Sequence, residues 1–212
     1  MLTLWGRDTS FNVQKVIWAL LELDIAFTRI DAGTVHGRLD TPEFGALNPN
    51  RRIPVLVDGD TVLWESNTII RYIAATWGQG SLWPEDPAIR AQADMWMDWQ
   101  QTVFQPAFQP VFYESVILPQ ARRDPDRLAR HLRLAGEAAL VLESWLRHRD
   151  YITGPAFSMG DIPIGTAIFR YFDLPLDRPA LPRLEAYFDR LRARQPYRNS
   201  AMISYEPLRA RE

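Results

Sequence analysis

The sequence contains no cysteine among its 212 residues. The chain can therefore form no disulfide, bind no zinc through thiolates and supply no thiol nucleophile, so any thiol chemistry must use the sulfur atom of a ligand. Histidine is scarce too, with three residues. Because His36 has no second ligand residue near it at metal-binding spacing, we expect no metal site.

The chain also lacks an excess of positive charge and any long apolar run. A formal net charge of -2 and a pI near 6.0 give no electrostatic footprint for a nucleic acid. No stretch of about 18 apolar residues occurs, and the start, MLTLWGRDTS, lacks the basic residues, apolar block and cleavage site of a secretion signal. We expect a soluble, cytoplasmic protein with neither a nucleic-acid nor a membrane partner.

The most informative segment runs from Asn48 to Ile73, NPNRRIPVLVDGDTVLWESNTIIRYI. Pro54 lies just before an apolar strand, where its missing N–H harms no ladder bond. X-Pro bonds are the ones with an accessible cis form. A cis bond here would turn the main chain of Ile53 outward, where an extended peptide could pair with it as an added strand.

Glu65 and Ser66 follow the second strand of this hairpin and precede a helix, which the spacing of the later isoleucines predicts. A helix N-terminus carries unpaired N–H groups and partial positive charge, and so attracts a carboxylate. Ser66 would add a hydroxyl to that anion site, and Glu65 could meet an ammonium group. Both residues also suit an ordinary helix start. Together with Ile53, they fit a small peptide such as glutathione.

Four motifs then carry a family resemblance. They are GRDTSFNVQKVIWALLELDIAF at 6–27, NPNRRIPVLV at 48–57, WESNTIIRYIA at 64–74 and FSMGDIPIG at 157–165. In this order and spacing the chain resembles the glutathione S-transferase family, in particular its bacterial theta-like and nu-like members, over nearly its whole length. The resemblance implies a homodimeric enzyme that takes glutathione as co-substrate and needs no other cofactor.

The pattern of elements predicts an α+β first domain over residues 1–78. Strands at 2–5 and 25–30, a helix from Val13, a short helix from Thr41-Pro42, the hairpin and the helix from Ser66 give β-α-β-α-β-β-α. This is the thioredoxin-like order. Residues 79–87 have the composition of a linker.

Residues 88–212 predict an all-helical second domain. Helices are expected over 88–116, from Asp124-Pro125 onward, over 159–172 and over 181–194. Pro106 and Pro110 should kink or divide the first of them. Ser158 to Asp161 form a capping box with Asp in place of Glu, so Asp161 is interpreted as structural.

The resemblance places the residue that contacts the glutathione sulfur in the loop after the first strand. Ser10 matches the serine of theta-like members, and Ser10 with Asn12 matches the Thr and Asn of nu-like members. Alternatively, Ser10 caps the following helix and Asn12 shapes the turn. A one-residue shift of the loop would exchange Ser10 for Thr9.

The remaining site residues follow from the same resemblance. Arg52, two residues before Pro54, corresponds to the position that often binds the glycyl carboxylate, with His36 and Arg38 as weaker candidates. Each is otherwise a solvated side chain. The aromatic-rich helix after the linker would border a pocket for a small hydrophobic electrophile, lined by some of the residues Trp96, Trp99 and Phe104. Packing in the core is the alternative role of these aromatic side chains.

Three functions remain compatible with the sequence. The first is a glutathione transferase in which Ser10 holds the thiolate for attack on a hydrophobic electrophile. The second is a glutathione-dependent disulfide-bond reductase without an enzyme cysteine. The third is a non-catalytic binding protein with the transferase fold, because fold alone does not decide function.

Overall fold

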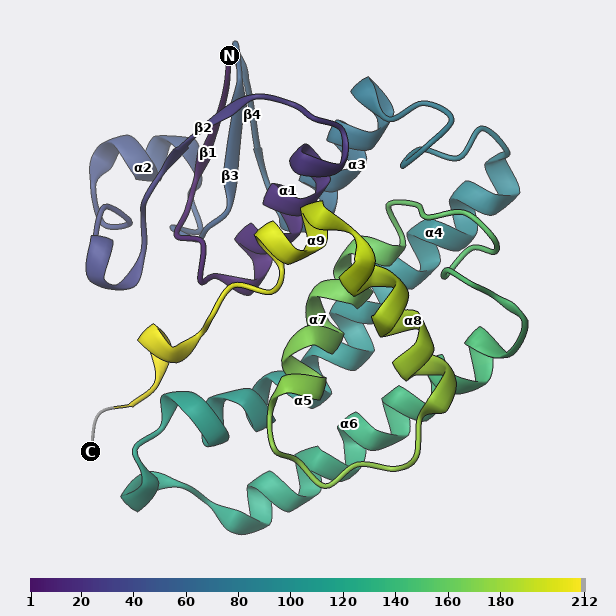
Figure 1. The fold of residues 1–212 in the computed structure, drawn as a ribbon. Coiled ribbons are helices and arrows are strands. Elements are labelled where there is room, and N and C mark those ends of the chain that lie inside the picture. The colour runs from purple at the N-terminus through teal and green to yellow at the C-terminus, as the bar shows by residue number, and fades with distance from the viewer. Residues whose placement is uncertain (211–212) are drawn as a thin grey trace.

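The computed structural model describes residues 1–210 and begins with a four-stranded sheet. The strands β1 (Leu2–Trp5), β2 (Phe27–Ile30), β3 (Val55–Asp58) and β4 (Thr61–Trp64) lie in the order β2-β1-β3-β4. β1 runs parallel to β2 and antiparallel to β3, and β3 pairs antiparallel with β4. The sheet lies on one side of the molecule, and most of the helices lie on the other (Figure 1).

Three helices complete the first part: α1 (Phe11–Glu22), α2 (Pro42–Leu47) and α3 (Ser66–Trp77). α1 and α3 pack against each other, while Phe44 of α2 packs with Ala32 and Val55 in a separate small core. The predicted thioredoxin-like order is confirmed. Only boundaries differ, since α1 begins two residues before Val13 and β2 begins at Phe27.

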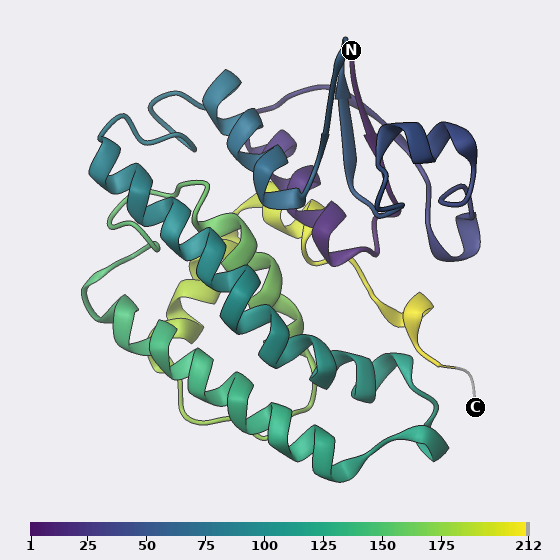
Figure 2. The same ribbon diagram turned by 180° about the vertical axis from the view of Figure 1, so that it is seen from behind.

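The second part is mostly helical, as predicted. It contains α4 (Pro87–Trp99), α5 (Gln105–Phe112), α6 (Pro125–Trp145), α7 (Asp161–Asp173), α8 (Pro182–Ala193) and the unpredicted short α9 (Gln195–Ser200). α5 packs along α6, as the view from behind shows (Figure 2). Within residues 1–210, none of the helices has the length and apolar character that crossing a membrane requires.

Pro106 and Pro110 do not break the helical path between residues 87 and 117. Instead, π-helical turns at Gln100–Phe104 and Tyr113–Ile117 flank α5. Proline has no N–H and crowds the carbonyl four residues earlier, so a wider turn can keep the helix continuous where an α-turn would clash. Several side chains of this helical path line a cleft described below.

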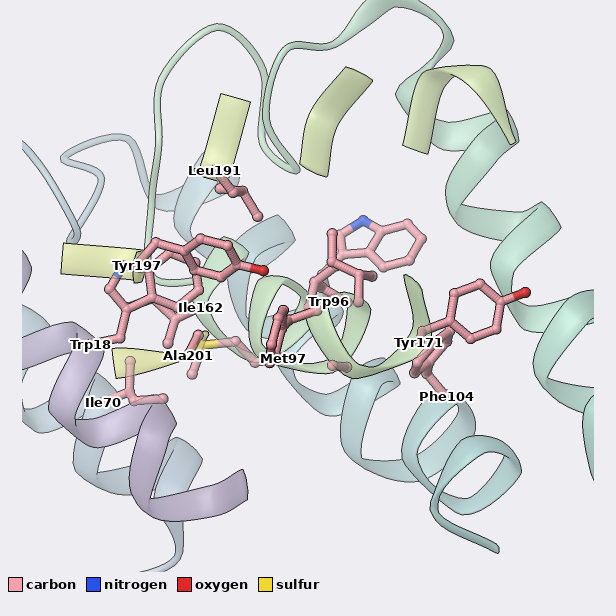
Figure 3. Packing of buried hydrophobic residues seen from close by; sticks show 14 of the residues in the cluster. Trp18, Ile70, Trp96, Met97, Phe104, Ile162, Tyr171, Leu191, Tyr197 and Ala201 are labelled. Carbon is pink, nitrogen blue, oxygen red and sulfur yellow. The ribbon is translucent and has the colours of Figure 1, made fainter. Parts of the chain in front are cut away.

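One apolar core joins the two parts of the chain. Trp18 of α1 lies against Tyr197 of α9, with ring centroids 4.6 Å apart (Figure 3). Gly165 of α7 permits this contact, because a Cβ atom there would lie 2.6 Å from the Trp18 ring. The expected linker is also tied down, since the Met159 N–H donates to the Leu82 carbonyl at 2.9 Å. α1 is therefore held by both halves.

Asp161 is buried and makes structural contacts only. Its Oδ2 accepts from the Ser158 N–H at 2.8 Å, and its Oδ1 accepts from the Ile152 N–H at 2.8 Å and the Tyr187 hydroxyl at 2.9 Å. Burial raises the pKa of Asp161 to about 6, against the lowering effect of these donors. These contacts support the structural interpretation.

Candidate functional site

The loop between β1 and α1 presents Ser10 with a free hydroxyl. Gly6 begins the loop at φ 143°, and a Cβ there would lie 2.4 Å from Val13, so only glycine fits. Ser10 is the N-cap residue of α1, with φ -77° and ψ 121°, but its side chain makes no capping hydrogen bond. Ser10 therefore occupies the N-cap position, as the capping alternative expects, but its hydroxyl does not cap the helix.

Asn12 links this loop to the start of α3. The Ser66 hydroxyl donates to the Asn12 Oδ1 at 3.4 Å, across 54 positions of sequence. Ser66 is buried with 5% of its surface exposed. The loop that carries Ser10 therefore lies next to the N-terminus of α3 at Ser66.

Glu65 has an unusual backbone conformation. It precedes α3 with φ 70° and ψ 112°, and its side chain makes no bond to the helix end. A non-glycine residue in this region costs about 1–3 kcal/mol and is concentrated at ligand-binding positions. The strained turn thus lies directly before the first N–H groups of α3, and the Glu65 side chain is exposed.

The Ile53-Pro54 peptide bond is cis. The β3–β4 ladder ends with the pair Val55–Trp64, so the main chain of Ile53 lies beyond it. Arg51 is occupied, because its Nη1 donates to the Leu39 and Thr41 carbonyls at 2.8 and 3.0 Å. Arg52 is exposed and makes no ion pair within residues 1–210.

His36 and Arg38 lie on the loop between β2 and α2. Both are exposed, and the Gly33 N–H closes the loop on the Gly37 carbonyl at 2.8 Å. Neither belongs to the cleft next to Ser10. The structure therefore brings Ser10, Asn12 and Ser66 together, but not these two basic residues.

A cleft of about 220 Å³ opens beside Ser10 and Asn12. Its aromatic wall comes from Phe11, Phe104, Phe108 and Phe112, and its polar wall includes Gln100, Gln105, Gln109, Arg7 and Arg170. Leu208 also lines the cleft, since the chain near the C-terminus returns here and the Ala210 N–H donates to the Val116 carbonyl at 2.9 Å.

Of the three aromatic residues expected at a second-substrate pocket, only Phe104 lines this cleft. Trp96 is 4% exposed and packs on Trp145 with centroids 5.1 Å apart. Trp99 packs on Trp96 at 4.8 Å. Trp96 therefore packs on α6, and Trp99 lies between Trp96 and Phe104, whereas Phe104 itself reaches the cleft.

The sequence did not reveal three cationic residues near the cleft. Lys15, the only lysine in the sequence, is fully buried on α1, and its Nζ donates to the Gln100 Oε1 at 3.0 Å. Burial lowers the pKa of Lys15 to about 7, opposed by the Glu65 charge. Arg7 and Arg170 line the cleft itself. A charge inside the apolar run after Val13 was the available signal for Lys15.

Comparisons with known proteins point to one family. The family model described as "Glutathione S-transferase, N-terminal domain" matches residues 4–80. Glutathione S-transferase GstB of Escherichia coli (strain K12) is 36% identical over 205 residues, which cover 96% of this chain and 99% of that protein.

Solved structures give the same result. The glutathione-bound theta class glutathione S-transferase from Xanthomonas axonopodis pv. citri superposes with a TM-score of 0.93 at 43% identity, covering 96% of this chain and 98% of that one. Its apo form gives a TM-score of 0.85 at 39% identity, with the same coverage.

Proposed function

The chain belongs to the glutathione S-transferase family, and we propose that Ser10 holds the glutathione thiol as a thiolate for attack on a hydrophobic electrophile. The observation that carries this proposal is the Ser10 hydroxyl, which makes no bond to its own helix and lies in the wall of the cleft. It is available to donate to a sulfur atom. The electrophile would occupy the cleft beside it.

The energy required is within reach of the groups present. A cysteinyl thiol has a pKa of about 8.5, and only its thiolate is a good nucleophile. Lowering this pKa by about two units takes roughly 2.7 kcal/mol of preferential thiolate stabilisation. A hydrogen bond to a charged group contributes about 1.5–3 kcal/mol. Ser10 and the amide N–H of Asn12, whose Oδ1 already accepts from Ser66, supply two such donors.

The rest of glutathione would lie along the edge of the sheet half. The γ-glutamyl carboxylate would accept from the N-terminal N–H groups of α3 and from the Ser66 hydroxyl, which would exchange its 3.4 Å hydrogen bond to Asn12 for this one. The ammonium of the same γ-glutamyl group would meet Glu65. The peptide would pair with the main chain of Ile53 before Pro54. Arg52, exposed and without an ion pair in residues 1–210, would bind the glycyl carboxylate, with His36 and Arg38 as alternatives from the neighbouring loop.

In the reaction, the thiolate forms a C–S bond to the electrophilic carbon, and the leaving group departs with its bonding electron pair. No covalent enzyme intermediate is needed. Ser10 lowers the thiol pKa, and the cleft holds the electrophile within reach, which adds the advantage of proximity.

The test uses Ser10→Ala and Asn12→Ala with Ser144→Ala as control, because Ser144 is exposed on α6 and does not line this cleft. Calorimetry measures glutathione binding, and initial rates are measured with chlorodinitrobenzene. We expect Ser10→Ala to lose at least about tenfold in rate, as a donor to a charged group predicts, while Ser144→Ala matches the parent. An unchanged rate in Ser10→Ala would remove Ser10 from its proposed role, and absence of glutathione binding would remove the transferase proposal.

A second candidate reaction uses the same residues. Asn12 lies in the cleft and is hydrogen-bonded to Ser66, which suits a disulfide-bond reductase that positions two glutathiones. One thiolate attacks the disulfide and releases a thiolate, and the second glutathione resolves the mixed disulfide to oxidised glutathione. Turnover of hydroxyethyl disulfide exceeding that of chlorodinitrobenzene would favour the reductase. A parent that binds glutathione but turns over neither substrate would support a non-catalytic binding protein.

We also propose that the enzyme is a cytoplasmic homodimer. Large apolar side chains are exposed near the sheet edge and on the first helix of the second part, at Val62, Trp64 and Met95. A second copy of this chain would cover them. Light scattering in solution should give twice the 24.5 kDa chain mass, and a monomer at micromolar concentration would contradict the dimer.

A further inference from the structure

Among residues 1–210, the wall of the cleft beside Ser10 contains two guanidinium groups and no acid. Arg7 comes from the loop after β1, and Arg170 comes from α7. The other lining residues are aromatic, aliphatic, hydroxyl or amide side chains, and none is Asp or Glu. The electrostatic character of the cleft is therefore positive.

Neither guanidinium forms an ion pair with an acid of residues 1–210, although the charge of nearby Asp8 partly offsets the effect of burial on the pKa of Arg7. The ion pairs within residues 1–210 include neither Arg7 nor Arg170. Asp8 is next to Arg7 in sequence, but its carboxylate pairs with Arg29 at 3.3 Å. By contrast, Arg194, whose side chain is 30% exposed, pairs with Glu22 at 2.8 and 2.6 Å.

Arg170 is 4% exposed, so its charge lies almost entirely out of water. One Nη donates to the Thr9 carbonyl at 2.8 Å and to the Gln14 Oε1 at 3.3 Å. The Nε atoms of both Arg170 and Arg7 are buried and have no partner within residues 1–210. Burial, and next the charge of Arg7, lower the pKa of Arg170 to about 10, which leaves it a cation at neutral pH.

Buried cations without a counterion are costly and normally pair with an acid. The Phe112 ring, 4.6 Å from the Arg170 guanidinium carbon, offsets part of this cost. A ring does not replace an anion, and two like charges on one wall repel each other. An acidic group bound between the two guanidiniums would satisfy both, with the planar fork geometry that guanidinium offers to a carboxylate.

We propose that Arg7 and Arg170 bind an acidic group of the second substrate, so that the electrophiles this enzyme prefers carry a carboxylate on an apolar or aromatic body. This rests on the proposed transferase function. The position explains the pairing of features: the aromatic wall from Phe104, Phe108 and Phe112 holds the apolar body, while Arg7, three residues before Ser10, places the acid next to the attacking sulfur.

The matched probes are 4-chloro-3,5-dinitrobenzoate and its methyl ester. In both, the glutathione thiolate forms a C–S bond at the chlorinated carbon, and chloride leaves with the bonding electrons. Each enzymatic kcat/KM is divided by the uncatalysed rate constant with glutathione in the same buffer, because the ester activates the ring more strongly. We expect the parent to prefer the acid by at least about tenfold, as a charge-assisted contact predicts.

The variants are Arg7→Gln and Arg170→Met, with Arg7→Lys as the charge-conserving comparison. Arg178→Gln is the matched control, because Arg178 also donates to main-chain carbonyls, of Tyr171 and Leu174, and does not line the cleft. We expect the acid-to-ester ratio to fall to about 1 in Arg7→Gln, to be partly kept in Arg7→Lys and to match the parent in Arg178→Gln. Thermal melting checks that each variant folds. If Arg170→Met does not fold, the acid-to-ester ratio of Arg7→Gln alone tests the proposal.

The outcomes separate this proposal from the transferase proposal. A ratio near 1 in the parent, or an unchanged ratio in Arg7→Gln, overturns the anion site while the transferase stands. If the arginines served the thiolate instead, acid and ester rates would fall equally and the ratio would stay, which also overturns it. If neither probe is turned over, calorimetry with the unreactive 3,5-dinitrobenzoate decides: binding that Arg7→Gln weakens tenfold supports the anion site, and no binding refutes it.

Discussion

Replacing Lys15 with methionine should stabilise the protein at neutral pH. Lys15 is fully buried, with one hydrogen bond to Gln100 and its Nζ 4.7 Å from the Phe11 ring centroid. Burial lowers its pKa from 10.5 to about 7, opposed by Glu65. One pKa unit corresponds to about 1.36 kcal/mol, so the buried charge costs the fold roughly 4 kcal/mol at pH 7. Loss of the hydrogen bond to Gln100 reduces the stability gain of the variant by about 1 kcal/mol.

The sign of the pH dependence follows from the direction of the shift. Because the folded-state pKa of Lys15 lies below its unfolded-state value, the unfolded chain binds more protons between about pH 7 and pH 10.5. The free energy of unfolding of the parent therefore rises with pH in this window. The Lys15→Met variant lacks this term. The net advantage of the variant, about 3 kcal/mol at pH 7, should shrink by about 2 kcal/mol at pH 9.

Two measurements check this. Urea unfolding of parent and Lys15→Met at pH 7 and pH 9 gives the change in the stability difference. Since the sequence has one lysine, lysine labelled with carbon-13 at Cε gives one side-chain resonance, whose titration reports the folded-state pKa directly. A stability difference that is the same at both pH values, or a resonance that titrates near 10.5, would refute the reasoning.

Three further predictions follow from the packing and the site. Gly165→Ala should lose about 2 kcal/mol of unfolding free energy, because its Cβ would overlap the Trp18 ring. Gly136→Ala in α6, where the new Cβ meets Pro179 only at 3.6 Å, should gain about 0.5–1 kcal/mol from helix propensity; urea unfolding that ranked the two alike would contradict this packing. Asp161→Asn should cost about 3 kcal/mol by the same assay, because an amide cannot accept from all its donors. Ser66→Ala should weaken glutathione binding at least tenfold by calorimetry, and an unchanged affinity would remove Ser66 from the carboxylate site.

Local patterns predicted most of the fold. The hairpin before Ser66, the start of α6 at Asp124-Pro125 and the order of the sheet half depend on turn residues, caps and periodicity within a few residues of each other. The effect of Pro106 and Pro110 on the helical path between residues 87 and 117 was harder to predict. A proline in the sequence indicates that one backbone hydrogen bond of the helix is missing. Whether the helix then ends or widens into a π-helical turn depends on the side chains that pack around the proline.

The electrostatic part of the site could not be predicted from local patterns. Arg170 bonds to the Thr9 carbonyl across 161 positions, and Lys15 meets Gln100 across 85 positions. The contact of either residue depends on how the helical half docks on α1, and a charge at either position resembles an ordinary solvated side chain in the sequence. The aromatic residues show the converse case. The composition around Trp96 and Trp99 suits the wall of a pocket, but in the structure both side chains pack in the core.

The burial of α1 by both halves has a consequence for how the protein unfolds. Residues 13–20 of this helix are all buried, against α3 on one side and against α7 and α9 on the other. If the helical half detaches, Trp18 loses its partners and the loop that carries Ser10 loses the Arg170 bond to Thr9. Glutathione affinity and helical structure should therefore disappear at the same urea concentration. Endoproteinase Lys-C has its one cleavage site in this helix at Lys15, so resistance to that protease reports the integrity of both halves at once.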